Sequence, residues 1–138
     1  MRFARARHAL PAWTSELVRF GIVGAVGFAA NVAAVYAVRG LAGLYLAGLI
    51  AWLAAATVTW LLNRLWTFRG RGRAAPAHKQ WALFLAANFV GFVLYYATYA
   101  GLVACAPFFA AQPVAAVFAG MLAGMAANFT LSRRLVFS

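Results

Sequence analysis

Acidic residues are almost missing from this sequence. Among its 138 residues, Glu16 is the only aspartate or glutamate, whereas twelve residues are lysine or arginine, and the formal net charge at pH 7 is +11. Charged residues make up 9% of the chain, against about a quarter of a typical soluble domain. Because 67% of the chain is apolar, a soluble fold would lack enough polar surface. The scarcity of charge therefore excludes an ordinary soluble domain and indicates a membrane protein.

The parts of most catalytic and metal sites are also missing. One carboxylate side chain makes no acid–base pair, and one cysteine, Cys105, makes neither a metal cluster nor an intramolecular disulfide. The phosphate-binding pattern GxxxxGKS/T is absent as well. We therefore predict a protein that is not an enzyme and needs no metal or cofactor. For Glu16, a favourable helix dipole and an ion pair with Arg19 are favoured over a proton relay.

Long uncharged runs, in contrast, fill most of the chain. Phe20–Val38 and Leu41–Leu62 are separated only by Arg39 and Gly40, and Gln80–Ser132 contains no charge. A single helix through the first two runs would be roughly twice as long as a bilayer core is thick. The chain is therefore expected to turn near Arg39 and Gly40. The first run shows no clear cleavage site and is interpreted as a transmembrane helix rather than a signal peptide.

Prolines divide the third uncharged run. Pro107 and the pair Gln112-Pro113 split it into spans at about Trp81–Ala106 and Pro113–Leu131, and a proline suits the first turn of a helix. Each half is long enough to cross a bilayer. The sequence thus predicts an all-α membrane protein with four transmembrane helices.

The basic residues gather at the ends of these spans. They are Arg2, Arg5, Arg7 and Arg19 before the first span, Arg64, Arg69, Arg71, Arg73 and Lys79 between the second and third, and Arg133 and Arg134 after the fourth. With four spans, these three segments share one side, and Arg39 alone lies opposite. The positive-inside rule then predicts a cytoplasmic (inner) membrane protein with both termini in the cytoplasm. Because the charges flank membrane spans, we expect anionic lipids and not nucleic acid as their partners.

The chain also contains an internal repeat. The stretch NRLWTFRGRGR, which starts at Asn63, returns as NFTLSRRLVF, which ends at Phe137. Aligning Asn63 with Ser132 matches Arg64 to Arg133. We predict two helical-hairpin repeats of parallel topology, related by an axis along the membrane normal. The predicted single transmembrane domain, residues 1–138, comprises a basic cytoplasmic N-terminal segment (1–16), repeat one (17–68), a basic cytoplasmic loop (69–80) and repeat two (81–138).

These motifs resemble those of a known family. RFGIVGAVGF near the start, LLNRLWTF at the end of the second span and NFTLSRRLVF at the end of the fourth are similar to the GtrA-like family of small four-helix membrane proteins, over about residues 17–138. Thr59-Trp60 and Ser132-Arg133 depart from the Asn-Phe and Asn-Arg pairs often found in the family. The resemblance implies work on polyprenyl-phosphate-linked sugars, usually proposed to be their flipping across the membrane. It also implies a partner membrane glycosyltransferase that loads the sugar onto the lipid.

Uncharged polar residues interrupt the spans at helical spacing, often beside glycines. Close helix packing accounts for the glycines, whereas packing and ligand binding are equal alternatives for the asparagines. We predict a site that faces the cytoplasm, where cationic side chains bind a lipid phosphate and amides and a tyrosine bind sugar hydroxyls. On the far side, Arg39 would receive the phosphate. The candidate residues are Arg64, Arg133, Arg134, Lys79, Asn63, Asn128, Asn88, Asn31, Tyr95 and Arg39.

Flipping of a polyprenyl-phosphate-linked sugar is the function that these observations favour. A subunit that positions a membrane glycosyltransferase without transporting anything is the alternative, and a small-molecule exporter is less well supported because no acid lies within a span. The glycine faces offer a surface for a homo-oligomer. Trp66, Phe68 and Phe137 are expected in the interfacial aromatic belt.

Overall fold

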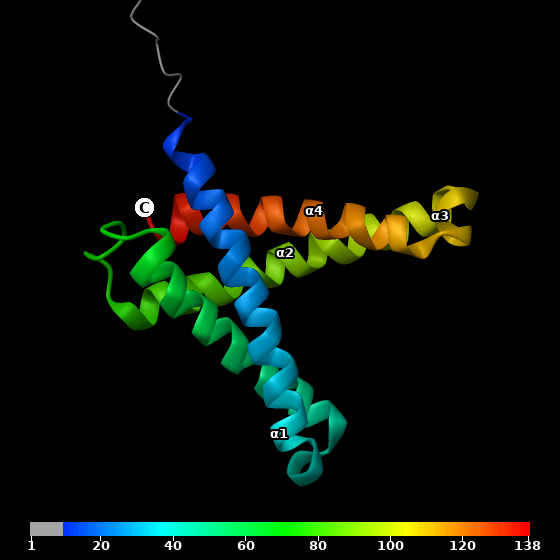
Figure 1. Cartoon of the computed structure of the whole chain (residues 1–138), viewed down its shortest axis with the longest axis horizontal. Coiled ribbons are helices and arrows are strands. Elements are labelled where there is room, and N and C mark those ends of the chain that lie inside the picture. The colour runs from blue at the N-terminus through cyan, green and yellow to red at the C-terminus, as the bar shows by residue number, and fades with distance from the viewer. Residues whose placement is uncertain (1–9) are drawn as a thin grey trace, which may run out of the picture.

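The computed structural model describes residues 10–138, and these residues form helices joined by short connections (Figure 1). Within this range, four helices are long and apolar enough to cross a membrane: Ala12–Gly43, Leu46–Thr67, Ala77–Cys105 and Val114–Val136. The predicted all-α membrane fold with four spans is therefore confirmed. Arg2, Arg5 and Arg7, which were expected on the basic side, lie outside the described residues.

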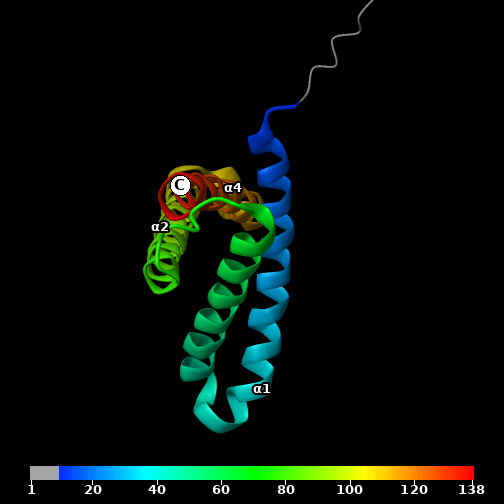
Figure 2. The same ribbon diagram turned by 90° about the vertical axis from the view of Figure 1, so that its left-hand side faces the viewer.

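The first two spans form one hairpin, α1 (Ala12–Leu62), whose two halves run side by side (Figures 1 and 2). The chain turns at Gly43, which has φ 73° and ψ 166°, a conformation that glycine adopts without the steric cost of a side chain. The prediction of a turn near Arg39 and Gly40 is therefore wrong by about one helical turn. Both of those residues are still helical, and the helix ends where a glycine takes a positive φ.

The last two spans form a second hairpin. It consists of α2 (Ala77–Cys105), the short α3 (Pro107–Ala111) and α4 (Pro113–Leu131). The two later helices each begin with a proline, as expected. The helix α2 begins within the predicted loop 69–80, directly after Pro76, so the connection between the hairpins is shorter than predicted.

Glycines allow α2 and α4 to approach closely. A methyl group added at Gly124 would lie 2.8 Å from the carbonyl oxygen of Gly91, and one added at Gly120 would lie 2.7 Å from that of Tyr95. Both distances are too short for real side chains, so the two backbones can meet only at glycines. The glycine face of α4 is thus used within the chain and is not free to form an oligomer.

The second and fourth spans end in the same way. After α1 and α4, one π-helical turn follows in each case, η1 (Asn63–Thr67) and η2 (Ser132–Val136). The turns close through matched backbone hydrogen bonds of 2.9 Å, from Phe68 N–H to the Asn63 carbonyl and from Phe137 N–H to the Ser132 carbonyl. The likeness of the two basic-aromatic stretches is therefore a likeness of local structure. The relation of the complete hairpins by one axis stays a prediction.

The phenylalanines that directly follow these two turns form the core of the molecule. The rings of Phe68 and Phe137 stack with centroids 4.7 Å apart, and these residues are 1% and 0% exposed. Phe20, Phe84 and Phe129 complete the cluster. The prediction that Phe68 and Phe137 belong to an interfacial belt is wrong. The π-helical turns direct the two rings inward, where they stack on each other.

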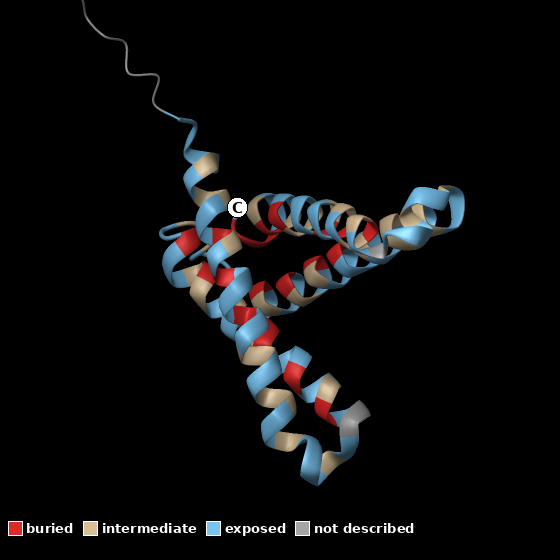
Figure 3. Cartoon of the chain, turned by 45° about the vertical axis from the view of Figure 1, so that its right-hand side comes forward, coloured by how far each residue is buried: buried red, intermediate tan, exposed pale blue. Residues whose placement is uncertain are grey.

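The two hairpins meet at one end and diverge from it (Figures 1 and 2). The start of α1, the connection 69–76 and the C-terminus all lie at this shared end, and buried residues gather there (Figure 3). The described basic segments therefore occupy one end of the molecule, as four spans require. We call it the basic end.

Candidate functional site

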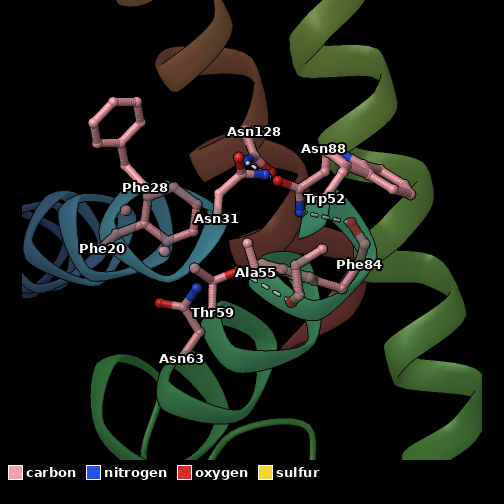
Figure 4. A pocket seen from close by; sticks show the side chains of 13 residues that line it. Phe20, Phe28, Asn31, Trp52, Ala55, Thr59, Asn63, Phe84, Asn88 and Asn128 are labelled. Carbon is pink, nitrogen blue, oxygen red and sulfur yellow. Dashed lines mark hydrogen bonds between the residues drawn. The ribbon is translucent and has the colours of Figure 1, made fainter. Parts of the chain in front are cut away.

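A cavity of about 250 Å³ lies between the hairpins, next to the aromatic core. Residues from both halves of α1, from η1, from α2 and from α4 surround it. They are Phe20, Gly24, Gly27, Phe28, Asn31, Trp52, Ala55, Ala56, Thr59, Asn63, Phe84, Asn88 and Asn128 (Figure 4). We call it the amide cavity, because four asparagines line it and none of these lining residues is charged.

The asparagines reach this cavity from different helices. Asn128 Nδ2 donates to Asn88 Oδ1 at 3.1 Å, and Asn88 Nδ2 donates to the Phe84 carbonyl at 2.9 Å. Ser132 Oγ donates to Asn128 Oδ1 at 3.3 Å. Asn31 points toward the same space from α1 (Figure 4), and no side-chain hydrogen bond holds it within the described chain. The structure thus brings four predicted site residues together, with α2 and α4 linked through amides.

Asn63 carries a buried acceptor that the described residues do not satisfy. The residue is 1% exposed, and its Oδ1 has no hydrogen-bond partner in residues 10–138. Trp60 Nε1 and Thr67 Oγ1, on the same face of this helix, are likewise buried without a partner. Leaving one such atom unpaired costs about 1–3 kcal/mol. Of these three residues, Asn63 alone lines the amide cavity, so its acceptor is the unpaired atom nearest to a ligand there.

Arg64 lies outside the lining of the amide cavity. Its Nη1 donates to Gln80 Oε1 at 2.7 Å, and its guanidinium carbon lies 5.7 Å from the centre of the Trp60 ring. Gln80 is completely buried, and its Nε2 donates to the carbonyls of Gly72 and Val136 at 3.0 and 3.2 Å. Gln80 was not among the predicted site residues, because a single amide at the start of an apolar run looks like any interfacial residue.

Glu16 is paired differently from the sequence expectation. Its two carboxylate oxygens accept hydrogen bonds from Arg71 Nη1 at 3.0 Å and from Arg133 Nε at 2.5 Å. The expected ion pair with Arg19 is not formed. Arg19 instead lies over the Trp66 ring, with its guanidinium carbon 5.8 Å from the ring centre. Glu16 reaches residues far away in sequence because the basic end brings α1, the connection and η2 together.

Two of the three predicted arginines of the basic end, Arg133 and Arg134, line a second cleft of about 360 Å³. It lies between the start of α1 and the end of the fourth span, and its lining residues are Trp13, Leu17, Ala126, Phe129, Thr130, Arg133 and Arg134. Arg133 and Arg134 therefore border this rim cleft, whereas Arg64 borders Gln80. A shared role of Arg64 and Arg133 at one phosphate stays a prediction.

The other predicted site residues lie apart from the amide cavity. The side chain of Tyr95 packs against Gly120 in the α2–α4 interface. Lys79 is exposed in the first turn of α2. Arg39 lies at the opposite end of the molecule, with its guanidinium carbon 4.3 Å from the centre of the Tyr36 ring. None of the three lines either cavity.

The lining of the amide cavity defines what it can bind. It offers amide donors and acceptors, the hydroxyl of Thr59 and the aromatic faces of Phe28 and Trp52. Without a charged group, it suits a neutral ligand that is rich in hydroxyls. In residues 10–138, no group of three or more His, Cys, Asp or Glu side chains is placed to hold a metal ion.

Comparison with known proteins places the chain in a family. No curated protein matches this sequence. The family described as GtrA/DPMS, transmembrane domain, matches residues 19–137, which is nearly the whole chain and includes most of the first span and all of the other three. The match covers the amide cavity and both π-helical turns. The chain therefore belongs to the GtrA/DPMS transmembrane domain family.

Proposed function

We propose that this protein moves a polyprenyl-phosphate-linked sugar across the membrane, with the sugar passing through the amide cavity. Its family is one of membrane proteins that handle sugar-linked lipids. The observation that supports flipping is the convergence of Asn31, Asn63, Asn88 and Asn128 on one uncharged cavity between the hairpins. Such a cavity supplies hydrogen bonds where the bilayer has none.

The energetics of a sugar in hydrocarbon indicate why amides would serve this role. Each hydroxyl that leaves water without a new hydrogen bond costs several kcal/mol, about 2–7 depending on the reference state. Asparagine both donates and accepts, so one side chain satisfies either kind of group on the sugar. The unpaired Oδ1 of Asn63 provides an acceptor at the edge of the cavity nearest the basic end. The sugar would therefore exchange water for amides as it leaves that end.

The phosphate would stay outside the uncharged cavity. Arg64 directly follows Asn63, and a guanidinium with one nitrogen on Gln80 retains other donors for a phosphate oxygen. The polyprenyl tail would remain in lipid beside the hairpins. Arg39, whose guanidinium lies over the Tyr36 ring near the tip of the first hairpin, would receive the phosphate there.

In this proposal, the distribution of charge sets the orientation of the protein in the membrane and the direction of transport. The basic end faces the cytoplasm by the positive-inside rule, where a membrane glycosyltransferase would load the sugar onto the lipid. Glu16, the protein's only acidic side chain, lies near the start of the first span and is paired with Arg71 and Arg133 at the basic end, so the middle of the spans holds no acid for proton coupling. Passage would therefore be facilitated and driven by consumption of the sugar on the outer side.

Transport of a labelled polyprenyl-phosphate hexose into proteoliposomes that contain only this protein tests the proposal. Asn31→Leu is the sharpest variant, since Asn31 makes no side-chain hydrogen bond in the described chain and a pure packing role predicts no effect. We expect it to slow transport about tenfold, as the loss of one hydrogen bond in a transition state does. Gln112→Leu removes an exposed amide outside the cavity and should transport at the wild-type rate.

Three results would overturn flipping. Wild-type rates for both Asn31→Leu and Asn88→Leu would show that the amides do not carry the sugar. Transport only in the presence of the glycosyltransferase would instead indicate a subunit that positions that enzyme. A proton gradient should make no difference, and loss of transport when only the gradient is collapsed would point to an exporter.

A further inference from the structure

The rim cleft between α1 and the end of the fourth span differs in chemistry from the amide cavity. We propose that it is a separate binding site for the phosphate of an anionic glycerophospholipid. A wall of two aromatic residues divides the two spaces: Phe20 lines the amide cavity and Phe129 lines the cleft. Their rings meet edge to face with centroids 5.5 Å apart, and both residues are less than 9% exposed.

The polar end of the cleft, where Arg133 and Arg134 lie, presents oriented cationic donors. Glu16 accepts from Nε of Arg133, so the terminal Nη nitrogens of that guanidinium have no hydrogen-bond partner among residues 10–138. Held in this way, Arg133 offers a planar pair of donors that matches two oxygens of a phosphate. Arg134 is exposed beside it, and Thr130 adds a hydroxyl. These donors and the positive charge fit an anionic group such as a phosphate and repel an amine.

The charge at this rim is not balanced within the described chain. Glu16 is the protein's only acidic side chain, and it is shared between Arg71 and Arg133. Arg134 then adds a further positive charge with no carboxylate side chain left to neutralise it. An anionic lipid balances this excess, whereas a zwitterionic lipid brings its own cation and balances none of it.

The other end of the cleft, away from Arg133 and Arg134, is apolar, which indicates a lipid and not a free phosphate. Leu17, Ala126 and Phe129 line it. Ala126 lies about 12 Å below Arg134 along the helix axis, at about 1.5 Å per residue, a depth that matches the glycerol and the first methylenes of an acyl chain. Trp13 at the mouth is 45% exposed, as is typical of tryptophan at a membrane interface.

A lipid in this cleft would bridge the two hairpins. One wall, Trp13 and Leu17, belongs to α1, and the other belongs to α4 and η2. The hairpins diverge from the basic end (Figure 2), so a ligand that contacts both walls would hold them together at this end. Because it binds only the folded form, it should also raise the melting temperature with lipid concentration.

Lipid binding to the full-length protein in detergent tests this site. Native mass spectrometry and thermal melting would follow titrations with phosphatidylglycerol and with phosphatidylcholine. We expect one phosphatidylglycerol to bind more tightly than phosphatidylcholine and to raise Tm. Arg134→Gln, which touches no acidic partner, should weaken phosphatidylglycerol binding about tenfold, the effect of losing one charge-assisted hydrogen bond.

Two matched variants distinguish this site from a general effect of positive charge and from the amide cavity. Arg73→Gln removes the same charge at the same end but lies outside the cleft, so it should bind phosphatidylglycerol like the wild type. Asn88→Leu alters the amide cavity and removes the hydrogen bond to Asn128, but it changes no residue that lines the cleft. It should therefore bind phosphatidylglycerol like the wild type, even if the flipping proposal fails. Equal binding by wild type and Arg134→Gln would overturn the site, as would an equal loss in Arg73→Gln.

Two further probes identify the source of the phosphate. Inorganic phosphate alone should not raise Tm, and an equal rise would show an oxyanion site with no need of a lipid. Polyprenyl monophosphate should not displace phosphatidylglycerol. If it did, and if Asn88→Leu also weakened phosphatidylglycerol binding, the two cavities would form one site and the inference would be wrong.

Discussion

Gln80 shows how one side chain organises the basic end. It is wholly buried where the two hairpins meet, and it links three segments: its amide accepts from Arg64 and donates to the carbonyls of Gly72 and Val136. Without Gln80, the carbonyls of Gly72 and Val136 would each lose this hydrogen-bond donor. The neutral amide of Gln80 thus links the three segments, and a buried salt bridge in its place would cost more desolvation energy.

At the residue scale, we therefore predict that Gln80→Ala destabilises the protein. The two carbonyls and the Arg64 guanidinium lose their partner, and the free energy of unfolding should fall by about 1–3 kcal/mol. Thermal melting in detergent measures the change. Gln112→Ala, at an exposed glutamine, serves as the control and should melt with the wild type. A Gln80→Ala variant of equal stability would mean that water or other groups satisfy the same atoms.

The hairpins are held together internally in different ways. In the second hairpin, Gly91 and Gly124 let the backbones of α2 and α4 approach, and Asn88 and Asn128 join them by a hydrogen bond. In the first hairpin, a methyl group added at Gly27 would lie 2.2 Å from the side chain of Thr59. Small residues thus set the interhelical distance in both, as expected where lipid supplies no hydrophobic drive for helix association.

At the element scale, we predict that Gly124→Ala separates α2 from α4. Its methyl would meet the Gly91 carbonyl at 2.8 Å, and backbone cannot yield as a flexible side chain does. Stability should fall by about 1–3 kcal/mol, as is usual for overpacking. Gly101→Ala is the matched control on α2, because its methyl would meet nothing within 4 Å. It should leave stability unchanged or raise it by less than about 1 kcal/mol, and an equal loss in both variants would exclude close packing as the cause.

The whole molecule is asymmetric in charge: the basic end carries most of the cations, and the two diverging hairpin tips carry few (Figure 1). The described cations other than Arg39 lie at the end where the start of α1, the connection 69–76 and the C-terminus meet (Figure 1). Cys105 ends α2 at the tip of the second hairpin, away from the basic end, and is exposed (Figure 1). The protein's single cysteine is therefore a natural reporter of that tip.

At the scale of the whole molecule, we predict that the basic end faces the cytoplasm. A maleimide that does not cross membranes should label Cys105 in intact cells. In a Cys105→Ala background, Arg73→Cys should be labelled only after the membrane is permeabilised, since position 73 lies on the exposed connection of the basic end. The reverse orientation would be established if Arg73→Cys were labelled in intact cells while Cys105 of the wild type was not.

The sequence by itself determined the class of the fold and the ends of most spans. Inside a bilayer a helix satisfies its own backbone, so hydropathy, charge and proline suffice to predict four helices. The repeated stretch also predicted a local likeness, and the two π-helical turns confirm it. The sequence prediction placed the first turn near Gly40, whereas it lies at Gly43. Either glycine could end the helix, and only the positive φ of Gly43 distinguishes them.

Only the tertiary structure decided which side chains meet. The asparagines of the candidate site were predicted one by one, but their convergence on a single cavity depends on the angles at which four helices pack. Glu16 reaches Arg71 and Arg133, which are 55 and 117 residues away, and the nearby Arg19 is not its partner. Phe68 and Phe137 stack in the core because two turns face each other. Hydropathy is a property of each segment, whereas pairing across the molecule depends on its packing, which no local pattern contains.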